Sequence, residues 1–306
     1  MSLYRNTVWF LKGLQEYTKG GYEAAARLFN EADLEVNVFI ITGANSGIRK
    51  PPPATNRQKR KYGFVNFGYS GTVHMVCRNE DRANEARKDV VEQSKNENVH
   101  VHLVDMSSPR KVWEFASGFS QNHNLHVLIN NAGCMVNQRE LTEDGLEKNF
   151  ATNTLGKKIT VSSGGMLVQK LNVEDLQFEK GSFDGTMAYA QNKRQQVIMT
   201  EQWAAQHKEI HFSSMHPGWA DTPAVQSSMP DFHERMKNKL RTEAQGADTV
   251  VWLAISDAAS RQPSGLFFQD RKAVSTHLPL ASSRSSPAED QKLMSKLEEL
   301  AVKFKC

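Results

Sequence analysis

The chain of 306 residues carries a formal net charge of +4, and 39% of its residues are hydrophobic and 24% charged. This composition is typical of a globular protein with a substantial core and excludes wholesale disorder. The small net charge excludes nucleic-acid binding that rests on overall charge, and the wide spacing of Cys77, Cys134 and Cys306 excludes a disulfide framework and a cysteine-based metal site. We therefore expect no metal and an intracellular, reducing compartment.

Residues 1–35 form an N-terminal segment of mixed apolar and basic character. Its apolar run Val8–Leu11 is too short for the hydrophobic region of a signal peptide, and no cleavage site of small residues follows it. The sequence also has no run of about 20 apolar residues of the kind that spans a bilayer. An amphipathic segment like this one either makes a peripheral membrane contact or docks on the protein's own surface, and we favour docking.

Strands and helices alternate through the next part of the chain. Short runs rich in β-branched and aromatic residues are typical of strands buried on both faces of a parallel sheet. The predicted strands are 36–42, 72–78, 99–105, 127–129 and 266–268, and the predicted helices between them include 81–95, 109–119 and 243–255. This order predicts an α/β fold, a single-domain, doubly wound parallel sheet of the Rossmann-like type over residues 36–280. A polar linker and a charged helix over residues 281–306 follow it.

A glycine turn, Gly43-Ala-Asn-Ser-Gly47, directly follows the first predicted strand. Glycines at this place let backbone N–H groups approach a pyrophosphate, normally at the start of a helix. Here Pro51-Pro52-Pro53 stops helical propagation, so we predict that the helix after the first strand is disrupted. The basic stretch Arg49–Lys61 is a nucleic-acid patch, a nuclear-import signal or a solvated loop. We favour the loop and expect no nucleic-acid partner.

The connection to the fifth predicted strand is short. Residues 142–156 predict a helix, and two lysines then lead directly into the strand at 159–163. The helix before the strand is therefore shortened. A parallel crossover needs about a dozen residues or more, so we expect that either the fifth strand is displaced or the helix is unwound. Catalysis is sensitive to shifts of about 1 Å, so this departure bears on any site at the end of that strand.

Tyr189 and Lys193 are four residues apart and so lie on one face of a predicted helix. An ammonium at that spacing favours the phenolate, which would lower the pKa of the tyrosine from its usual value of about 10. Tyr189 is therefore a candidate proton donor and acceptor. The pair alone is equally compatible with an exposed helix face that carries one aromatic residue, so the surrounding motifs decide between the two interpretations.

Several short motifs occur in the order and the rough spacing of the classical short-chain dehydrogenase/reductase family. They are Thr42-Gly43-Ala-Asn-Ser-Gly47, Asn130-Asn-Ala-Gly133, Val161-Ser162-Ser163, Tyr189-x-x-x-Lys193 and His216-Pro217-Gly218. Each motif is common by itself, but the ordered set is specific and spans about residues 36–270. The chain therefore resembles this family, and it is similar, more distantly, to the retinol dehydrogenases.

The resemblance implies an oxidoreductase that interconverts an alcohol and a carbonyl compound by hydride transfer, with Tyr189 as general acid/base. It implies that Lys193 lowers the pKa of Tyr189 and binds the nicotinamide ribose. Ser163 would orient the substrate oxygen, with Ser162 as the fallback, and Asn153 would hold a proton-relay water. The implied cofactor-binding residues are Gly43, Ser46, Gly47, Ile48, Arg78, Asp105, Asn130, Ala132, Gly133, Tyr189, Lys193, Pro217, Gly218 and Thr222.

Arg78 ends the second predicted strand, at the position that selects between the two nicotinamide cofactors. An arginine there suits a 2′-phosphate, whereas an acid would bind a ribose 2′-hydroxyl, so NADP(H) is favoured over NAD(H). The resemblance implies a lipophilic alcohol or carbonyl substrate, such as a retinoid or a steroid. Met229, Phe232 and Met236 either line an apolar pocket for it or form the buried face of a lid helix. The oligomeric state stays open.

One position departs from the family's glycine-rich loop, because Arg49 replaces its third glycine. Together with the disrupted helix and the short crossover, this departure indicates that whole segments of sequence have been swapped or lost at sharp boundaries, with intact motifs on either side. We therefore keep a second hypothesis, in which a splice variant or an error in gene prediction has produced a catalytically impaired scaffold. Such a scaffold would fold but would not bind the cofactor at its broken nucleotide-binding loop.

Overall fold

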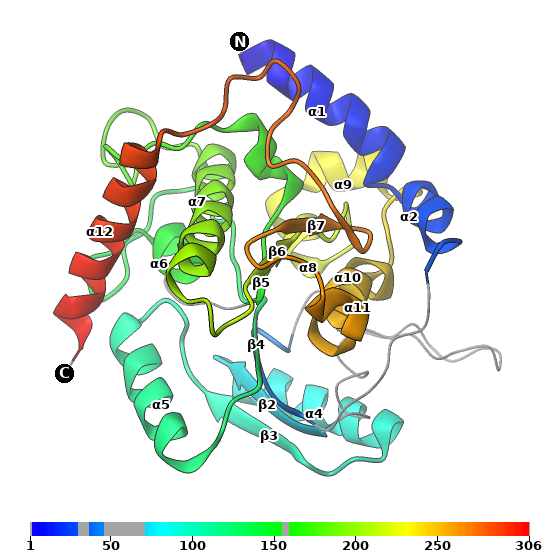
Figure 1. Cartoon of the computed structure of the whole chain (residues 1–306), viewed down its shortest axis with the longest axis vertical. Coiled ribbons are helices and arrows are strands. Elements are labelled where there is room, and N and C mark those ends of the chain that lie inside the picture. The colour runs from blue at the N-terminus through cyan, green and yellow to red at the C-terminus, as the bar shows by residue number, and fades with distance from the viewer. Residues whose placement is uncertain (1, 30–36, 46–70, 155–158, 306) are drawn as a thin grey trace.

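The computed structural model describes residues 2–29, 37–45, 71–154 and 159–305 of the chain. An eight-stranded sheet with the order β3-β2-β1-β4-β5-β6-β7-β8 runs through its centre (Figure 1). All neighbours from β3 to β7 are parallel, and β8 is antiparallel to β7. The strands are β1 Asn37–Thr42, β2 Gly71–Cys77, β3 Val99–Leu103, β4 Val127–Asn130, β5 Ile159–Val161, β6 Ser213–Met215, β7 Phe267–Gln269 and β8 Lys272–Ala273. This order confirms the predicted doubly wound, Rossmann-like fold.

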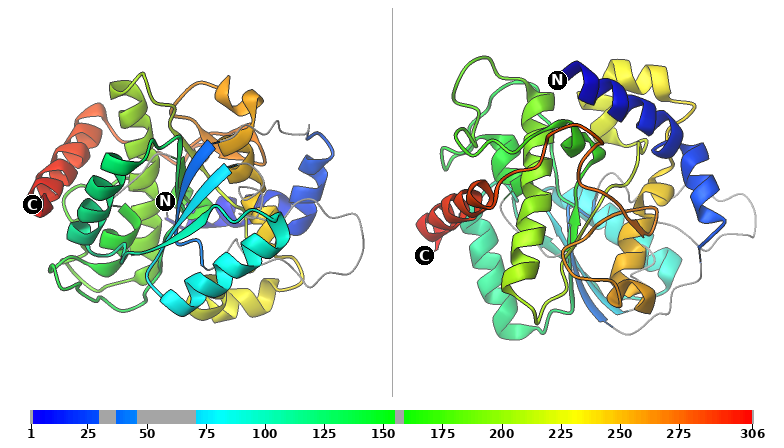
Figure 2. Two further views of the ribbon diagram at one scale, coloured as in Figure 1. Left: turned by 90° about the horizontal axis from the view of Figure 1, so that it is seen from below. Right: turned by 45° about the horizontal axis from the view of Figure 1, so that its top comes forward.

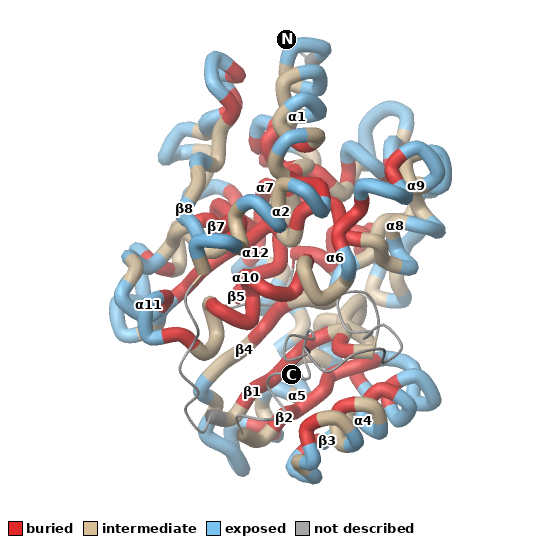
Figure 3. The backbone as a smooth tube through the Cα atoms, turned by 90° about the vertical axis from the view of Figure 1, so that its right-hand side faces the viewer, coloured by how far each residue is buried: buried red, intermediate tan, exposed pale blue. Residues whose placement is uncertain are grey.

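Helices cover both faces of the sheet, as the views in Figure 2 show. On one face, α4 (Glu80–Ser94) and α10 (Glu243–Ile255) pack against Phe39 and Ile41 of β1. On the other face, α5 (Pro109–Asn122) packs against Ile40, because successive residues of a strand point to opposite sides. The second layer also holds α6 (Lys148–Thr154) and α7 (Gly185–Gln206). The central strands are therefore buried from both sides (Figure 3), which explains their continuous apolar sequences.

The fifth strand lies in its regular place in the sheet. β5 pairs in parallel with β4 through Ile129↔Ile159 and with β6 through Thr160↔Ser214. The alternative that this strand is displaced is therefore wrong. The helix before the strand is short instead. Residues 155–158 of the connection lie outside the described part of the chain.

Helix α6 is shortened, as predicted, but it begins at Lys148 rather than at Thr142. The backbone N–H groups of Asn149 and Phe150 donate to the buried Glu147 carboxylate at 2.9 and 2.8 Å. This carboxylate satisfies donors that the first turn of a helix leaves unpaired. A buried side-chain cap thus fixes the start of the helix, and the preceding residues form turns instead.

Some predicted features lie outside the described residues. They include Ser46, Gly47, Ile48, the basic stretch Arg49–Lys61 and the predicted disruption of the helix after β1.

The N-terminal segment packs on the body of the protein. It forms α1 (Ser2–Glu16) and α2 (Lys19–Ala26). Tyr17 between them is fully buried, and the Trp219 backbone N–H donates to its carbonyl at 2.8 Å. The Trp9 and Trp219 rings meet edge to face with centroids 5.6 Å apart. Among the helices described here, none is both long and apolar enough to cross a membrane.

The C-terminal helix α12 (Pro287–Phe304) packs beside α7 and α5 (Figures 1 and 2). Leu293 and Leu297 are its buried contacts and join a core cluster with Phe150 of α6. Ser286 and Glu289 cap its start reciprocally. This helix therefore covers α7, which carries the tyrosine–lysine pair, from the outside.

Candidate active site

Tyr189 and Lys193 lie on α7, whose first turn is capped by the Asp184 carboxylate. Lys193 is 3% exposed, and its ammonium lies 5.3 Å from the centre of the Tyr189 ring. The ammonium donates to the Val161 carbonyl of β5 at 2.9 Å. The predicted helical spacing therefore brings the pair together, and the lysine also ties α7 to the end of the central sheet.

Ser163 is the serine that faces Tyr189. Its side chain lies close enough to Tyr189 to lower the pKa of the tyrosine, and the Ser163 hydroxyl accepts from the Gly165 backbone N–H at 3.1 Å at the start of η1 (Gly164–Val168). The Ser162 hydroxyl instead donates to the Lys193 backbone carbonyl at 2.9 Å. The structure therefore brings Ser163 to the tyrosine and turns the fallback residue, Ser162, away into the core.

Asn153 holds the chain that follows β4. Its amide oxygen accepts from the Cys134 backbone N–H at 2.9 Å, and its amide nitrogen donates to the Cys134 carbonyl at 2.9 Å. A Cβ at Gly133 would lie 3.2 Å from the Asn153 amide oxygen and 3.6 Å from the Lys193 ammonium. These three residues converge closely, so a side chain at Gly133 would crowd the place where they meet.

Burial sets the ionisation of the central pair. It raises the pKa of Tyr189 to about 12, although the neighbouring Ser163 side chain partly opposes this rise. Burial also lowers the pKa of Lys193 to about 8. The expected fall in the tyrosine pKa is therefore wrong for this structure, because desolvation favours the neutral phenol and the ammonium is directed at a backbone carbonyl. At neutral pH the arrangement presents a protonated phenol beside a serine hydroxyl.

The first glycine turn packs closely against the segment after β4. Gly43 has a φ of +64°, and a Cβ there would lie 2.8 Å from the Ala132 Cα. The Ala132 backbone N–H donates to the Thr42 hydroxyl at 3.0 Å, and the Asn131 amide donates to the Gly43 carbonyl at 3.2 Å. Asn130 is buried, and its amide nitrogen has no partner within the described residues. This edge therefore combines a tightly packed turn that only glycine fits with a spare hydrogen-bond donor.

Arg78 and Asp105 lie at the ends of β2 and β3. Arg78 is exposed, and the Asp105 carboxylate accepts from the Ser107 backbone N–H at 2.9 Å and hydroxyl at 2.7 Å. Burial pushes the pKa of Asp105 upward, but these bonds and the charges of Arg78 and Lys111 outweigh it and leave the pKa below its usual value. An anionic and a cationic group thus neighbour each other here.

The loop after β6 contains His216, Pro217, Gly218 and Thr222. The His216 Nδ1 accepts from the Gly164 backbone N–H at 2.8 Å. Gly218 has a φ of +76°, and any Cβ there would overlap the buried Arg241 guanidinium. The Thr222 hydroxyl accepts from the Val225 backbone N–H at 3.3 Å and caps α8 (Pro223–Ser228). This loop is therefore fixed on both sides.

Residues expected to line a pocket or a lid helix turn inward. Phe232 on α9 (Pro230–Met236) meets the Trp219 ring edge to face at 5.1 Å, and Met236 is 5% exposed. Both belong to the cluster that holds Tyr17. Phe232 and Met236 therefore form the buried face of α9, as the second alternative expected, whereas Met229 is half-buried between α8 and α9. A lid role of this helix stays a prediction.

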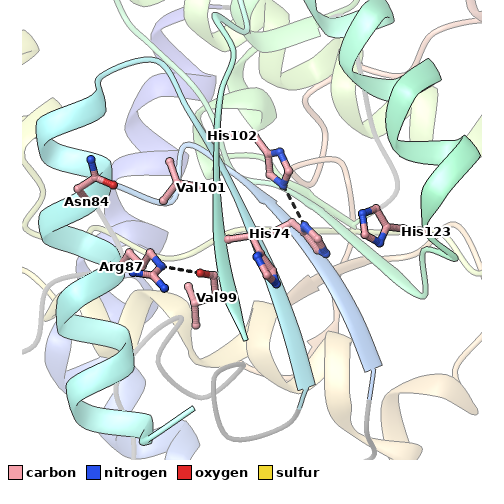
Figure 4. Close-up of a pocket in the computed structure, with 8 residues that line it drawn as sticks. His74, Asn84, Arg87, Val99, Val101, His102 and His123 are labelled. Atoms are coloured by element: carbon pink, nitrogen blue, oxygen red, sulfur yellow. Dashed lines mark hydrogen bonds between the residues drawn. The ribbon is translucent and has the colours of Figure 1, made fainter. Parts of the chain in front are cut away.

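A second group of titratable side chains lies away from this site. His74, His100, His102 and His123 surround an open pocket of about 480 Å³ at the β2–β3 edge of the sheet (Figure 4). The His74 Nδ1 lies 2.9 Å from the His102 Nε2. Within the described ranges, no three or more His, Cys, Asp or Glu residues are arranged to hold a metal ion. The pocket is therefore a histidine cluster without a ligand set.

Four further residues belong to the support of the site: Thr42, Asn131, His216 and Arg241. Thr42, Asn131 and His216 stand inside motifs that are visible in the sequence, so their place in those motifs could have indicated that they support the site. Arg241 stands in no such motif, and its place under Gly218 depends on tertiary packing alone.

No family model matches the chain. The chain is 59% identical over 327 aligned positions to human dehydrogenase/reductase SDR family member 12, with full coverage of both chains. It is 30% identical to human retinol dehydrogenase 12 over 77% of this chain and 78% of that protein. The first alignment is longer than this 306-residue chain, so that relative has positions without a counterpart here.

Solved structures share the fold. An uncharacterized protein from Mycobacterium paratuberculosis superposes with a TM-score of 0.66 at 21% identity, and the match covers 91% of this chain and 97% of that one. A protein of Escherichia coli CFT073 described as a short-chain dehydrogenase and solved with NADPH has a TM-score of 0.57 at 16% identity, over 80% and 100% of the two chains.

Proposed function

Because the chain belongs to the short-chain dehydrogenase/reductase family, we propose that it is an NADP(H)-dependent oxidoreductase that interconverts a lipophilic alcohol and its carbonyl compound. The observation that carries this proposal is the Tyr189–Ser163 pair, backed by Lys193, at the carboxyl end of the central strands. The lipophilic substrate class rests on the likeness to human retinol dehydrogenase 12.

The Tyr189 and Ser163 hydroxyls are the two donors that would bind a substrate oxygen. Donors that are already oriented stabilise negative charge as it builds on that oxygen. When bound, the nicotinamide supplies or accepts the hydride. Tyr189 then passes its phenol proton to the substrate oxygen, while Lys193 holds α7 against β5 and Asn153 holds the backbone at Cys134.

The ionisation of Tyr189 sets which proton-transfer role this residue can take at a given pH. Its pKa of about 12 keeps the phenol protonated at neutral pH, and a protonated group serves as the acid that carbonyl reduction needs. Alcohol oxidation needs the phenolate as base instead. We therefore propose that Tyr189 is in the form needed as the acid for carbonyl reduction at neutral pH, and that alcohol oxidation becomes faster as the pH rises.

Two of the described residues carry groups that suit a dinucleotide. The Asn130 amide has a spare donor, and the Lys193 ammonium can donate to ribose hydroxyls. We propose that the exposed Arg78 binds the 2′-phosphate of NADP(H). A reducing compartment stays a prediction, and a peripheral membrane contact through the N-terminal segment stays the untested alternative to docking.

The proposal is tested by the reduction of all-trans-retinal, which is measured as the loss of NADPH absorbance. The same assay with NADH is the comparison. We expect turnover that prefers NADPH. The variant Arg78→Asp should lose about tenfold or more of that preference, the size of one charge-assisted contact. Lys88→Asp on the nearby α4, where the side chain is 76% exposed, is the matched charge control and should not change it. A protein that folds but turns over neither retinal nor other lipophilic carbonyls would contradict the proposal.

A further inference from the structure

We propose that His216, held in place by Tyr17 of the N-terminal segment, is a positioning residue for Ser163. This inference rests on the proposed function and extends it to the N-terminal segment, which lies outside the family motifs. Its central contact is the hydrogen bond from the Gly164 backbone N–H to the His216 Nδ1, at 2.8 Å. Gly164 directly follows Ser163 and begins η1, so the bond fixes the backbone turn that aims the serine hydroxyl at Tyr189.

The bond requires one particular form of the imidazole. Because Nδ1 accepts, the proton of the neutral ring must lie on Nε2. His216 is 2% exposed, and burial together with the charges of Arg241 and Lys12 lowers its pKa well below the usual value. The ring therefore stays neutral and keeps its acceptor throughout the pH range in which proteins normally work.

Tyr17 holds the ring from the other side. The Tyr17 and His216 rings meet edge to face, with centroids 4.4 Å apart and planes at 84°. A Cβ at Gly164 would lie 2.7 Å from the His216 Nε2 and 3.1 Å from the Tyr17 Cε2. These three residues therefore fill the same small space, and a shift of the tyrosine would be transmitted to the backbone beside Ser163.

Arg241 anchors the N-terminal segment to the loop after β6. It forms a bidentate pair with Asp270 at 2.7 and 2.9 Å, and it also donates to the carbonyls of Glu16 at 2.6 Å and Pro217 at 3.4 Å. One buried guanidinium thus connects the end of α1 to the loop that carries His216. The position of Tyr17 is set by this anchor rather than by the helix alone.

The test compares three variants of the full-length protein. His216→Leu removes the acceptor, whereas His216→Asn restores one, because the asparagine amide oxygen occupies the position of the histidine Nδ1. His74→Leu makes the same change at an equally buried histidine, 2% exposed, outside the site. The readouts are backbone amide hydrogen exchange across Gly164–Val168, and kcat and KM for NADPH with all-trans-retinal as the probe.

We expect His216→Leu to lower kcat by about 10- to 100-fold, the cost of a misplacement of about 1 Å, with the KM for NADPH within about twofold of wild type. The Gly164 amide should exchange about tenfold faster, since it has lost its acceptor. His216→Asn should recover most of both effects, and His74→Leu should change neither.

The inference is overturned if His216→Leu leaves kcat and the exchange of Gly164 unchanged, or if the asparagine variant is as impaired as the leucine variant. An equal loss of kcat in His74→Leu would also overturn it, because any large substitution in the core would then have the same effect. If wild type reduces no retinal, the proposed function fails, and the exchange comparison alone still decides whether His216 fixes the turn after Ser163.

Discussion

Two buried histidines of this protein lie in different parts of the sheet and show what burial alone does not provide. His216 after β6 and His74 in β2 are each 2% exposed, and burial is the main cause that lowers the pKa of both. Their partners differ. The His216 Nδ1 accepts from a backbone N–H next to Ser163, whereas the His74 Nδ1 faces another imidazole beside an open pocket. A depressed pKa marks both places, but only His216 is joined to hydroxyls that can act on a substrate.

The largest expected difference between the two regions is catalytic. Tyr189→Phe removes the proton donor and should lower carbonyl reduction by about 10³-fold, within the range of a lost general acid. NADPH binding should persist, because the ring still packs on α7. His74→Leu should keep wild-type turnover. Steady-state kinetics of both variants measure this, and comparable losses in the two would remove the distinction between the regions.

The anchor under His216 should dominate stability. In Asp270→Ala, the Arg241 guanidinium, whose side chain is 1% exposed, loses its carboxylate partner. A buried charge left unpaired costs about 3–5 kcal/mol of unfolding free energy. The exposed pair Lys292–Glu174, with side chains 47% and 65% exposed, offers a control in Glu174→Gln, which should leave the unfolding free energy nearly unchanged because exposed ion pairs contribute little. Urea unfolding that gives equal losses for both would show that the anchor is unimportant.

The histidine cluster should make stability depend on pH. The pKa of His74 falls from 6.5 to about 4 on folding, so below about pH 6.5 the unfolded state binds a proton that the folded state refuses. Stability is therefore highest above that pH and falls as the pH drops toward 4, by at most about 1.4 kcal/mol per pH unit for this residue. His74→Leu should flatten the dependence measured by urea unfolding at several pH values. An unchanged slope would count against the cluster as its source.

The smallest expected effect separates the ring of Tyr17 from its hydroxyl. That hydroxyl is buried and finds no hydrogen-bond partner in the described part of the chain. Tyr17→Phe keeps the contact with His216 and removes a group that costs free energy when it is desolvated and unpaired. Thermal unfolding should show an unchanged or higher Tm. The corresponding gain in unfolding free energy should be at most about 1 kcal/mol. A clear drop in Tm would reveal a partner for this hydroxyl.

Much of the fold was predictable from local sequence patterns. The apolar runs of β1 to β4 and the alternating helices predicted the parallel sheet, because strands buried on two faces need such runs. The ordered motifs likewise predicted that Tyr189, Lys193 and Ser163 would meet. Fixed spacing within one helix, and positions at the ends of adjacent parallel strands, carry that information directly.

Other features depend on tertiary contacts that the sequence pattern does not contain. The start of α6 is set by the buried Glu147 cap rather than by helix propensity. The direction of the Tyr189 pKa shift depends on burial and on where the Lys193 ammonium points. The contact between Tyr17 and His216 joins distant parts of the chain. Each would need three-dimensional knowledge before it could be predicted.

The central claim is that the described residues form a working dinucleotide and proton-transfer site. Fluorescence titration of the purified protein with NADPH, and with NADH as the comparison, tests it most directly. The account predicts saturable binding that is about tenfold or more tighter for NADPH, from the charge-assisted contact with Arg78. A cooperatively folded protein that binds neither nucleotide would contradict it and leave a family scaffold without the cofactor chemistry.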